Sequence, residues 1–222
     1  DRLAREGALC TKFYAATPVC SPSRSSLLSG QYPQNTPVTN NNLILSDEVI
    51  SFAELLKQTG YATGYAGKWH LDGGGKPQWE PKRNFGFTDN RYMFNRGHWK
   101  QFEDTPQGPR VKARTNGKAS YSVQGADDKS FATDWLSTKT IEFIDEHKEQ
   151  PFCYMLSIPD PHGPDTVRAP YDSMFDDRVV EKPRTFDKDA ARAPSWAKPS
   201  PKCNYKMAQY HGMMKCIDDN VG

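Results

Sequence analysis

Residues able to attack an ester and to hold an anion occur together near the start of the chain, between Cys20 and Arg24. Pro22 suits the first turn of a helix and Gly30 suits its exit, so a short helix is expected from Pro22 to Ser29, with Cys20 at its start. The positive end of a helix favours an anion, and Arg24 lies one turn from Cys20 with a planar fork of donors. A nucleophile beside an anion-binding arginine predicts attack on a phosphate or sulfate ester.

Two further groups of polar residues follow segments that the sequence predicts to be strands. Lys68 and His70 come two residues apart after a predicted strand at 61–66, so both are expected on one face. His162 lies between two prolines and follows a second predicted strand at 152–158. Because α/β sheets bind ligands beyond the carboxyl ends of their strands, these three side chains are candidates for the same site.

Helix and strand signals around these residues predict an α/β layered fold. Ser51 and Glu54 form a capping box that predicts a helix over 51–59. An apolar stripe predicts another helix over 130–148. The remaining expected elements are strands within 8–20, at 61–66 and at 152–158, and a helix at 205–221.

Two long segments, 72–128 and 159–204, are rich in glycine, proline and charge and are expected to be loop-rich excursions. The aromatic residues of the first segment favour an ordered excursion. Trp79 and Trp99 could stack on sugar rings, but a private hydrophobic core of the excursion is the favoured interpretation.

A basic run without acidic residues lies inside the first excursion, at Arg110, Lys112 and Arg114. Two interpretations stay open for it: a solvated loop, or a subsite that binds a polyanionic sulfated sugar. The sequence gives no reason to assign a role to the other histidines, which are His98, His147 and His211.

The composition excludes several classes of protein. The 222 residues include 29 Lys+Arg and 27 Asp+Glu, a net charge of +2, whereas a nucleic-acid or membrane-surface protein would be strongly basic. No apolar run approaches the roughly 20 residues of a membrane span. Besides Cys20 there are four cysteines, whose pairing cannot be deduced from the sequence: Cys10, Cys153, Cys203 and Cys216.

Together these motifs resemble the type I sulfatases, the formylglycine-dependent enzymes of the alkaline phosphatase superfamily. The Cys-x-Pro-x-Arg element at Cys20 is similar to the signature for conversion of cysteine to formylglycine. Residues 60–70 resemble the second signature, which ends in Gly-Lys-x-His, and Pro161-His162 resembles the Pro-His element. The resemblance implies an α/β fold with an alkaline-phosphatase-like central sheet flanked by helices. It also implies that residues 1–222 are an internal part of a single catalytic domain.

The resemblance implies a role for each matching residue. Cys20, converted by a formylglycine-generating enzyme, would hydrate to a diol that attacks sulfur and forms a covalent sulfate intermediate. Arg24 would stabilise the diol, and His70 would bond to it and assist elimination. Lys68 and His162 would bind the substrate, and His162 would also protonate the leaving alkoxide.

The same resemblance implies one calcium ion, with Cys20 as its only ligand in this chain and the other ligands outside it. Residues 1–222 alone are therefore expected to be inactive. The acidic group at Asp218 and Asp219 is expected to be a solvated helix end instead of a metal site. The implied substrate is a sulfated carbohydrate or an aryl sulfate, and the implied location is exported: periplasmic, secreted or lysosomal.

Other functions remain as alternatives. A phosphoesterase of the same superfamily would also grip a tetrahedral anion, but such relatives use Ser, Thr or metal-bound water where this chain has Cys20. A cysteine-dependent tyrosine phosphatase needs arginine six residues after the cysteine, where this chain has Ser26. A non-catalytic sugar-binding pseudoenzyme is the third alternative, and the presence of Lys68, His70 and His162 counts against it.

Overall fold

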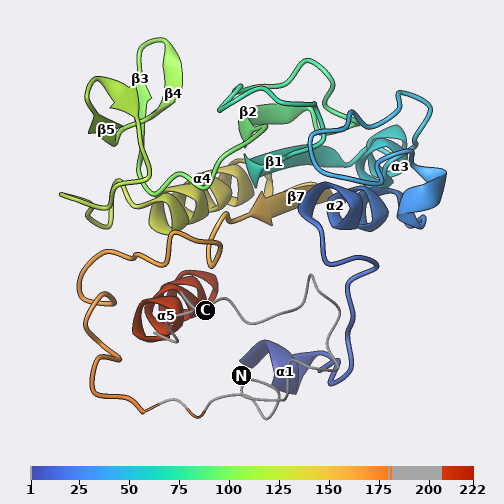
Figure 1. Ribbon diagram of the computed structural model, residues 1–222. Coiled ribbons are helices and arrows are strands. Elements are labelled where there is room, and N and C mark those ends of the chain that lie inside the picture. The colour runs from blue at the N-terminus through green and yellow to red at the C-terminus, as the bar shows by residue number, and fades with distance from the viewer. Residues whose placement is uncertain (1, 180, 182–206) are drawn as a thin grey trace, which may run out of the picture.

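The computed structural model describes residues 2–179, 181 and 207–222, with a parallel sheet at its centre (Figure 1). The strands lie in the order β2 (Asp89–Phe94), β1 (Ala62–Lys68) and β7 (Phe152–Ser157). Both strand pairs are parallel, so the carboxyl ends of all three strands meet at one edge of the sheet. Lys68 and His70 lie at this edge, because β1 ends there.

Helices cover both faces of the sheet. The helices α2 (Cys20–Ser29) and α3 (Phe52–Gln58) contribute to a core on one face, and α4 (Ala132–His147) contributes to a core on the other. Successive strand residues point to opposite faces, so Tyr65 joins the first core and its neighbour Ala66 the second. The predicted α/β layered architecture is confirmed.

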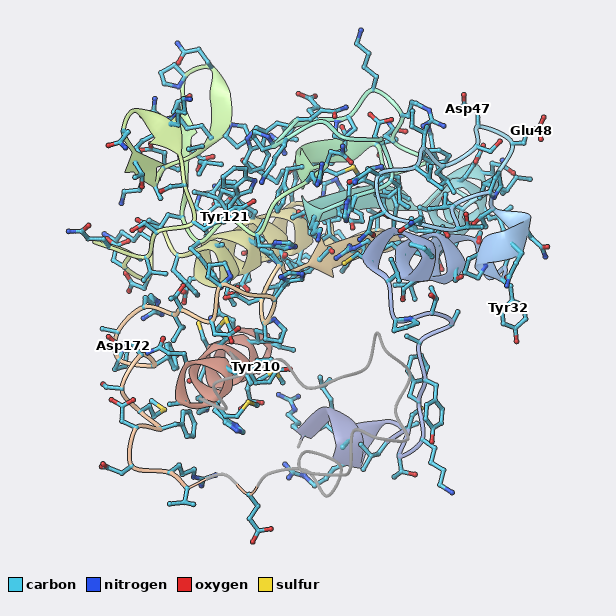
Figure 2. All side chains as sticks on the ribbon, in the orientation of Figure 1. Tyr32, Asp47, Glu48, Tyr121, Asp172 and Tyr210 are labelled. Atoms are coloured by element: carbon cyan, nitrogen blue, oxygen red, sulfur yellow. The ribbon has the colours of Figure 1, made fainter. Side chains whose placement is uncertain are left out.

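The remaining elements lie around this three-layer unit. The helix α5 (Ala208–Val221) contacts α4, and a third core joins it to the loop around Val167 and Tyr171. Figure 2 labels Tyr210 on α5 and Asp172 on the loop beside it. The other elements are α1 (Arg2–Glu6), the 3-10 helix η1 (Pro33–Asn35), and two small hairpins made of β3 (Phe102–Thr105) with β4 (Gly108–Val111) and β5 (Arg114–Thr115) with β6 (Lys118–Ala119).

Local sequence signals explain where the helices begin and end. The Ser51 hydroxyl accepts a hydrogen bond from the Glu54 N–H at 3.1 Å and caps the start of α3. Gly30 has a φ of 68° and donates its N–H to the Ser26 carbonyl at 2.9 Å, which closes α2. The helices expected at 51–59, 130–148 and 205–221 are confirmed with shifts of a few residues at their ends.

The strand expected within 8–20 was wrong. The segment 8–16 forms no strand: it pairs with no described strand, and Phe13 and Tyr14 are 81% and 83% exposed. The loop-rich excursion at 72–128 contributes one strand, β2, to the central sheet, which the sequence analysis did not predict. β2 begins with Asp89, Asn90 and Arg91, so it lacks the apolar run of a buried strand.

The aromatic residues of the excursion do not form the private core that was expected, because they pack into the two cores of the sheet: Phe87 with α2 and α3, and Trp79 and Trp99 with α4. The Trp79 ring lies 5.3 Å from the Phe94 ring and 5.2 Å from the Phe102 ring, measured between centroids. Trp99 is only 5% exposed and donates its ring N–H to the Arg96 carbonyl at 3.0 Å. These two indoles therefore stabilise the excursion.

The second excursion, expected at 159–204, is described only in part, because residues 180 and 182–206 lie outside the described residues. Cys203 falls in that range. The four described cysteines are all free thiols. None of the described helices is long and apolar enough to cross a membrane.

Candidate active site

Cys20 is the first residue of α2, and its half-buried side chain lines two cavities at the carboxyl edge of the sheet. Ser21 fixes this end of the helix, because its N–H donates to Asn41 Oδ1 at 3.0 Å and its hydroxyl donates to the His70 carbonyl at 2.7 Å. Pro22 has no N–H to satisfy. An anion at this helix start therefore finds no free N–H at residue 21 or 22.

Arg24 joins α2 to the ends of two strands. Its guanidinium donates to the Lys68 carbonyl at 2.6 Å and to the Ser157 hydroxyl at 2.7 Å. The Tyr65 and Ser157 hydroxyls also donate to the Lys68 carbonyl, at 2.6 Å and 2.9 Å. Arg24 therefore holds Cys20 beside Lys68 and also adds a positive charge to the wall of one cavity.

The close approach of β1 and β7 brings Lys68 to this edge. Gly67, the residue before it, has a φ of 105° and lies opposite Ser157. A Cβ at Gly67 would collide with the Ser157 carbonyl oxygen, so only glycine fits there. The Lys68 side chain is 2% exposed, and its ammonium donates to His98 Nε2 at 2.8 Å.

His70 has a left-handed backbone, with a φ of 61°, which is uncommon for a residue other than glycine. Three contacts hold it there: its N–H donates to the Asn95 carbonyl at 2.6 Å, its carbonyl accepts from Ser21, and Nε2 lies 3.3 Å from Asn42 Oδ1. Nδ1 is buried and makes no hydrogen bond. Strain of this kind gathers at functional sites, where surrounding contacts impose it.

His162 and His98 stack face to face, with ring centroids 3.4 Å apart and planes 9° from parallel. His162 Nδ1 lies 3.0 Å from the Gly163 carbonyl, which can only accept, so Nδ1 carries a proton. The Lys68 ammonium can only donate, so His98 Nε2 accepts and its ring proton is on Nδ1. His98, which sequence analysis left without a role, thus touches two of the predicted catalytic side chains.

Burial and like charges shape the protonation of this group. Burial lowers the pKa of Lys68 to about 8, with a further lowering from the Arg24 charge. Burial lowers the pKa of His70 to about 3 and that of His98 to about 3, and the Lys68 charge adds to both shifts. Near neutral pH these two histidines are uncharged, so Lys68 and Arg24 supply the positive charge next to Cys20.

Two cavities meet at Cys20. The first, of about 170 Å³, is named here the Lys68 cavity; Cys20, Lys68, His70, His98 and His162 are among its lining residues. The second, of about 420 Å³, is the Arg24 cavity, which shares Cys20, Lys68 and His162 and adds Arg24. All five predicted catalytic residues therefore line this pair of cavities, and no Asp or Glu is among the described residues that line either one.

A buried ion pair supports the loop that carries His162. Lys100 and Asp160 have side chains 0% and 1% exposed, and their charged atoms are 2.6 Å apart. Lys100 also contacts the Met213 sulfur at 3.2 Å, and the Thr133 hydroxyl lies 3.4 Å from Asp160. Since Asp160 is two residues before His162, this pair fixes the start of the turn on which the histidine stands.

The predicted basic subsite lies apart from these cavities. Arg110, Lys112 and Arg114 belong to the hairpin region of β4 and β5, and none of them lines the Lys68 or the Arg24 cavity. Arg110 pairs with Glu103 at 2.8 Å. Lys112 lines a separate cavity together with several acidic residues.

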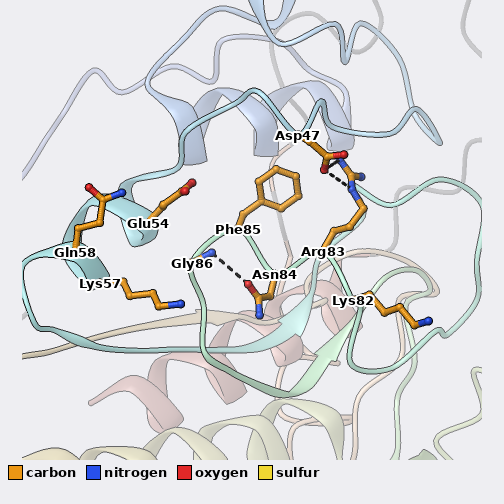
Figure 3. A pocket seen from close by; sticks show the side chains of 9 residues that line it. All are labelled: Asp47, Glu54, Lys57, Gln58, Lys82, Arg83, Asn84, Phe85 and Gly86. Atoms are coloured by element: carbon orange, nitrogen blue, oxygen red, sulfur yellow. Dashed lines mark hydrogen bonds and ion pairs between the residues drawn. The ribbon is translucent and has the colours of Figure 1, made fainter.

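Another cavity, of about 530 Å³, is also separate from Cys20 (Figure 3). Its walls come from Asp47, α3 and residues 82–86, and they include both acidic and basic side chains. Its Arg83 is already engaged by Asp47 and Asp72. A cavity whose arginine is neutralised in this way is a weaker anion site than the Lys68 cavity.

The described residues do not form a calcium site. A calcium ion needs six to eight oxygen ligands, and no group of three Asp, Glu, His or Cys side chains in the described part of the chain could hold a metal ion. Asp219 pairs with Lys215 and accepts from the Tyr171 hydroxyl at 2.9 Å, which supports the expectation of an ordinary helix end.

Comparison with known proteins supports the predicted family. The Sulfatase family model matches residues 1–222. An ulvan-active sulfatase from Formosa agariphila is 30% identical over 197 residues, which cover 87% of this chain and 36% of that protein. An N-acetylgalactosamine-6-O-sulfatase from Bacteroides thetaiotaomicron is 29% identical over a region that covers 74% of this chain and 43% of that protein.

A solved structure supports the same family. The yidJ protein of Bacteroides fragilis matches with a TM-score of 0.67 and 26% identity, over 93% of this chain and 47% of that one. The fold is thus the α/β alkaline-phosphatase-like fold of the sulfatases, and the chain spans less than half the length of these relatives. Because the family model matches all 222 residues, this chain belongs to the sulfatase family.

Proposed function

We propose that this chain carries most of the reacting groups of an enzyme that hydrolyses sulfate esters, on a sulfated carbohydrate or an aryl sulfate. One observation carries the proposal: Cys20, Lys68, His70 and His162 line one cavity, and no carboxylate is among its described lining residues. A cavity with basic and neutral donors and no acid favours an anionic ester. The relatives named for sulfated sugars support this choice of substrate.

The nucleophile is proposed to be Cys20 after conversion to formylglycine by a formylglycine-generating enzyme. That group, when present, supplies an oxygen nucleophile that the unmodified thiol lacks. Lys68 faces the same cavity as Cys20 and is placed to hold the ester oxygens, while Arg24 keeps α2 against the strand ends. His70 Nδ1, buried without a partner, can bond to a hydroxyl at position 20.

His162 is proposed to protonate the departing alcohol. Its Nδ1 proton bonds to the Gly163 carbonyl, so Nε2 is the atom that exchanges a proton with substrate. The His98 ring stacks on one face of the His162 ring, and His98 Nε2 accepts a hydrogen bond from the Lys68 ammonium. His98 therefore positions both His162 and Lys68. Calcium and an exported location are further expectations of the family resemblance.

A change of His162 to alanine is expected to separate two kinds of substrate. A sugar alkoxide is a poor leaving group and needs the proton, so kcat/KM for sugar sulfates should fall by about 10²- to 10⁴-fold. A nitrophenolate needs little protonation, so 4-nitrophenyl sulfate should lose much less. Steady-state kinetics on both substrates measure the difference, and equal losses would assign His162 to binding or structure.

The basic run at Arg110, Lys112 and Arg114 carries a separate prediction. If it binds a polyanion, changing all three to glutamine should raise KM for a sulfated polysaccharide several-fold and flatten its salt dependence, because exposed charges act mainly on highly charged partners. KM for 4-nitrophenyl sulfate should stay within about twofold, because a small ester does not reach the hairpin. Unchanged polysaccharide kinetics across a salt series would leave the run as a solvated surface.

A phosphoesterase of the same superfamily is the second candidate. Its substrate would be a phosphate ester, a tetrahedral anion that the same cations could hold. The cysteine at position 20 favours the sulfatase. A side-by-side assay of 4-nitrophenyl sulfate and 4-nitrophenyl phosphate distinguishes the two, and the sulfate ester is expected to be the better substrate.

A further inference from the structure

The Lys68 cavity contains two cations that the proposed chemistry does not use. Lys76 and Arg96 both line it, along with Gly97 and Tyr121. Lys76 is on the loop after β1, and Arg96 is on the loop after β2. Both loops leave the carboxyl edge of the sheet, so the two cations belong to the same edge as Lys68.

Neither cation has a carboxylate partner among the described residues. The Lys76 ammonium lies over the Trp99 and Tyr121 rings, 5.4 Å and 4.8 Å from their centroids, and makes no ion pair with a described residue. The side chain of Arg96 makes one long contact, to the Gly74 carbonyl at 3.5 Å, and likewise has no carboxylate partner in the described chain. Figure 2 labels Tyr121, whose ring supports the lysine, on the segment between the hairpins and α4.

This arrangement brings several like charges together. Three cations, Lys68, Lys76 and Arg96, line a cavity of about 170 Å³, and none of the described residues that line it is acidic. Burial is the largest cause that lowers the pKa of Lys68 and of His70, and the positive charge of Arg96 is one of the smaller causes that lower both pKa values further. Repulsion of this kind is relieved when an anion binds, so the cavity favours ligands with more than one negative charge.

A single sulfate ester does not account for all of this charge. It carries one negative charge, and Lys68 together with Arg24 already matches the sulfate and the nucleophile beside it. Lys76 and Arg96 are then available to bind a second anionic group. Arg96 offers the planar fork that binds a carboxylate or sulfate through two oxygens.

We propose that Lys76 and Arg96 form a second anion subsite, which binds a carboxylate or a second sulfate on the same substrate whose sulfate ester reacts at Cys20. The inference rests on the proposed function and narrows its substrate class to sugars with at least two anionic groups. Because both cations share one small cavity with Lys68, the two groups lie on one sugar or on directly linked sugars.

Matched aryl sulfates test this subsite without knowledge of the sugar. The first pair is 3-carboxyphenyl sulfate and its neutral counterpart 3-carbamoylphenyl sulfate. The second pair is benzene-1,3-diyl disulfate and 3-methoxyphenyl sulfate. For the enzyme in its full natural length, we expect kcat/KM to be about tenfold higher for the anionic member of at least one pair, as charge-assisted bonds to the added group predict. The pair that shows the preference tells whether the subsite takes a carboxylate or a sulfate.

Variants assign the preference to the two residues. In the double variant Lys76→Met with Arg96→Gln the ratio of kcat/KM within each pair should fall to near one, while Arg96→Lys should keep most of it. Lys57→Met and Arg91→Gln remove comparable charges away from the cavity and should leave the ratio unchanged. Using a ratio cancels any general effect of a variant on turnover.

The outcomes separate the two proposals. Equal kcat/KM for the anionic and neutral members in the wild-type enzyme, or an unchanged preference in the double variant, would overturn the second subsite. If the wild-type enzyme hydrolyses none of the four esters, the proposed function fails. Dissociation constants of the same four compounds, measured by calorimetry, would then still decide whether Lys76 and Arg96 bind the added anion.

Discussion

Replacing Cys20 with alanine is expected to reduce kcat/KM for 4-nitrophenyl sulfate by roughly 10³- to 10⁶-fold, the loss seen when a covalent nucleophile is removed. The substitution deletes one atom from a half-buried side chain, so the free energy of unfolding should change by about 1 kcal/mol or less. Steady-state kinetics and urea unfolding of the full-length enzyme measure the two quantities.

Cys153 provides the matched control. It is also a free, half-buried cysteine, but it lies on β7 and lines neither the Lys68 nor the Arg24 cavity. Burial raises the pKa of its thiol, which keeps it protonated and unreactive. Cys153→Ala should therefore retain activity. A Cys20→Ala enzyme with wild-type turnover would remove Cys20 from the chemistry.

The largest effect on stability is expected from the ion pair between Lys100 and Asp160. Changing Lys100 to methionine leaves the Asp160 carboxyl group, whose side chain is 1% exposed, without a cation, which costs about 3–5 kcal/mol when a buried pair is broken. Burial already raises the pKa of Asp160, so the lone group would take up a proton. The free energy of unfolding in urea measures the loss, and kcat/KM should fall as well because the turn before His162 loosens.

Two further variants make this test specific. Lys148 pairs with Asp145 on the surface, where both side chains are more than half exposed, so Lys148→Met should cost at most about 1 kcal/mol. The double change Lys100→Met with Asp160→Leu removes both charges and should cost less than Lys100→Met alone. A cost for Lys100→Met as small as that for Lys148→Met would show that the pair does not hold the turn.

Elements with strong local signals could be predicted from the sequence. The capping box of Ser51 and Glu54 marks the start of α3, and apolar residues along α4 predict that helix, although Ile141 and Ile144 in its second half are 57% and 38% exposed. β2 could not be predicted, because the two cores that bury Met93 and Phe94 come from distant helices and loops. The strand expected within 8–20 was wrong for a related reason: an apolar stretch becomes a strand only beside a partner, and no described strand lies there.

The site could be predicted only where its residues form contiguous motifs. Cys20, Lys68 and His162 each stand in a short pattern with proline, glycine or arginine nearby. His98 stands in no such pattern, and its contacts with Lys68 and His162 arise because the loop after β2 folds over the sheet edge. The residue before His98 is Gly97, and a glycine predicts a turn at this point of the chain. The structure has such a turn, because Gly97 has a φ of 118°.

Mass spectrometry of the peptide that contains Cys20 tests the central claim most directly. The enzyme would be produced with a formylglycine-generating enzyme, digested, and treated with a hydrazide that captures aldehydes. The account predicts a peptide that has lost the thiol sulfur, carries an aldehyde at position 20, and increases in proportion to sulfatase activity. A fully active preparation in which every Cys20 peptide keeps its unmodified thiol would contradict it.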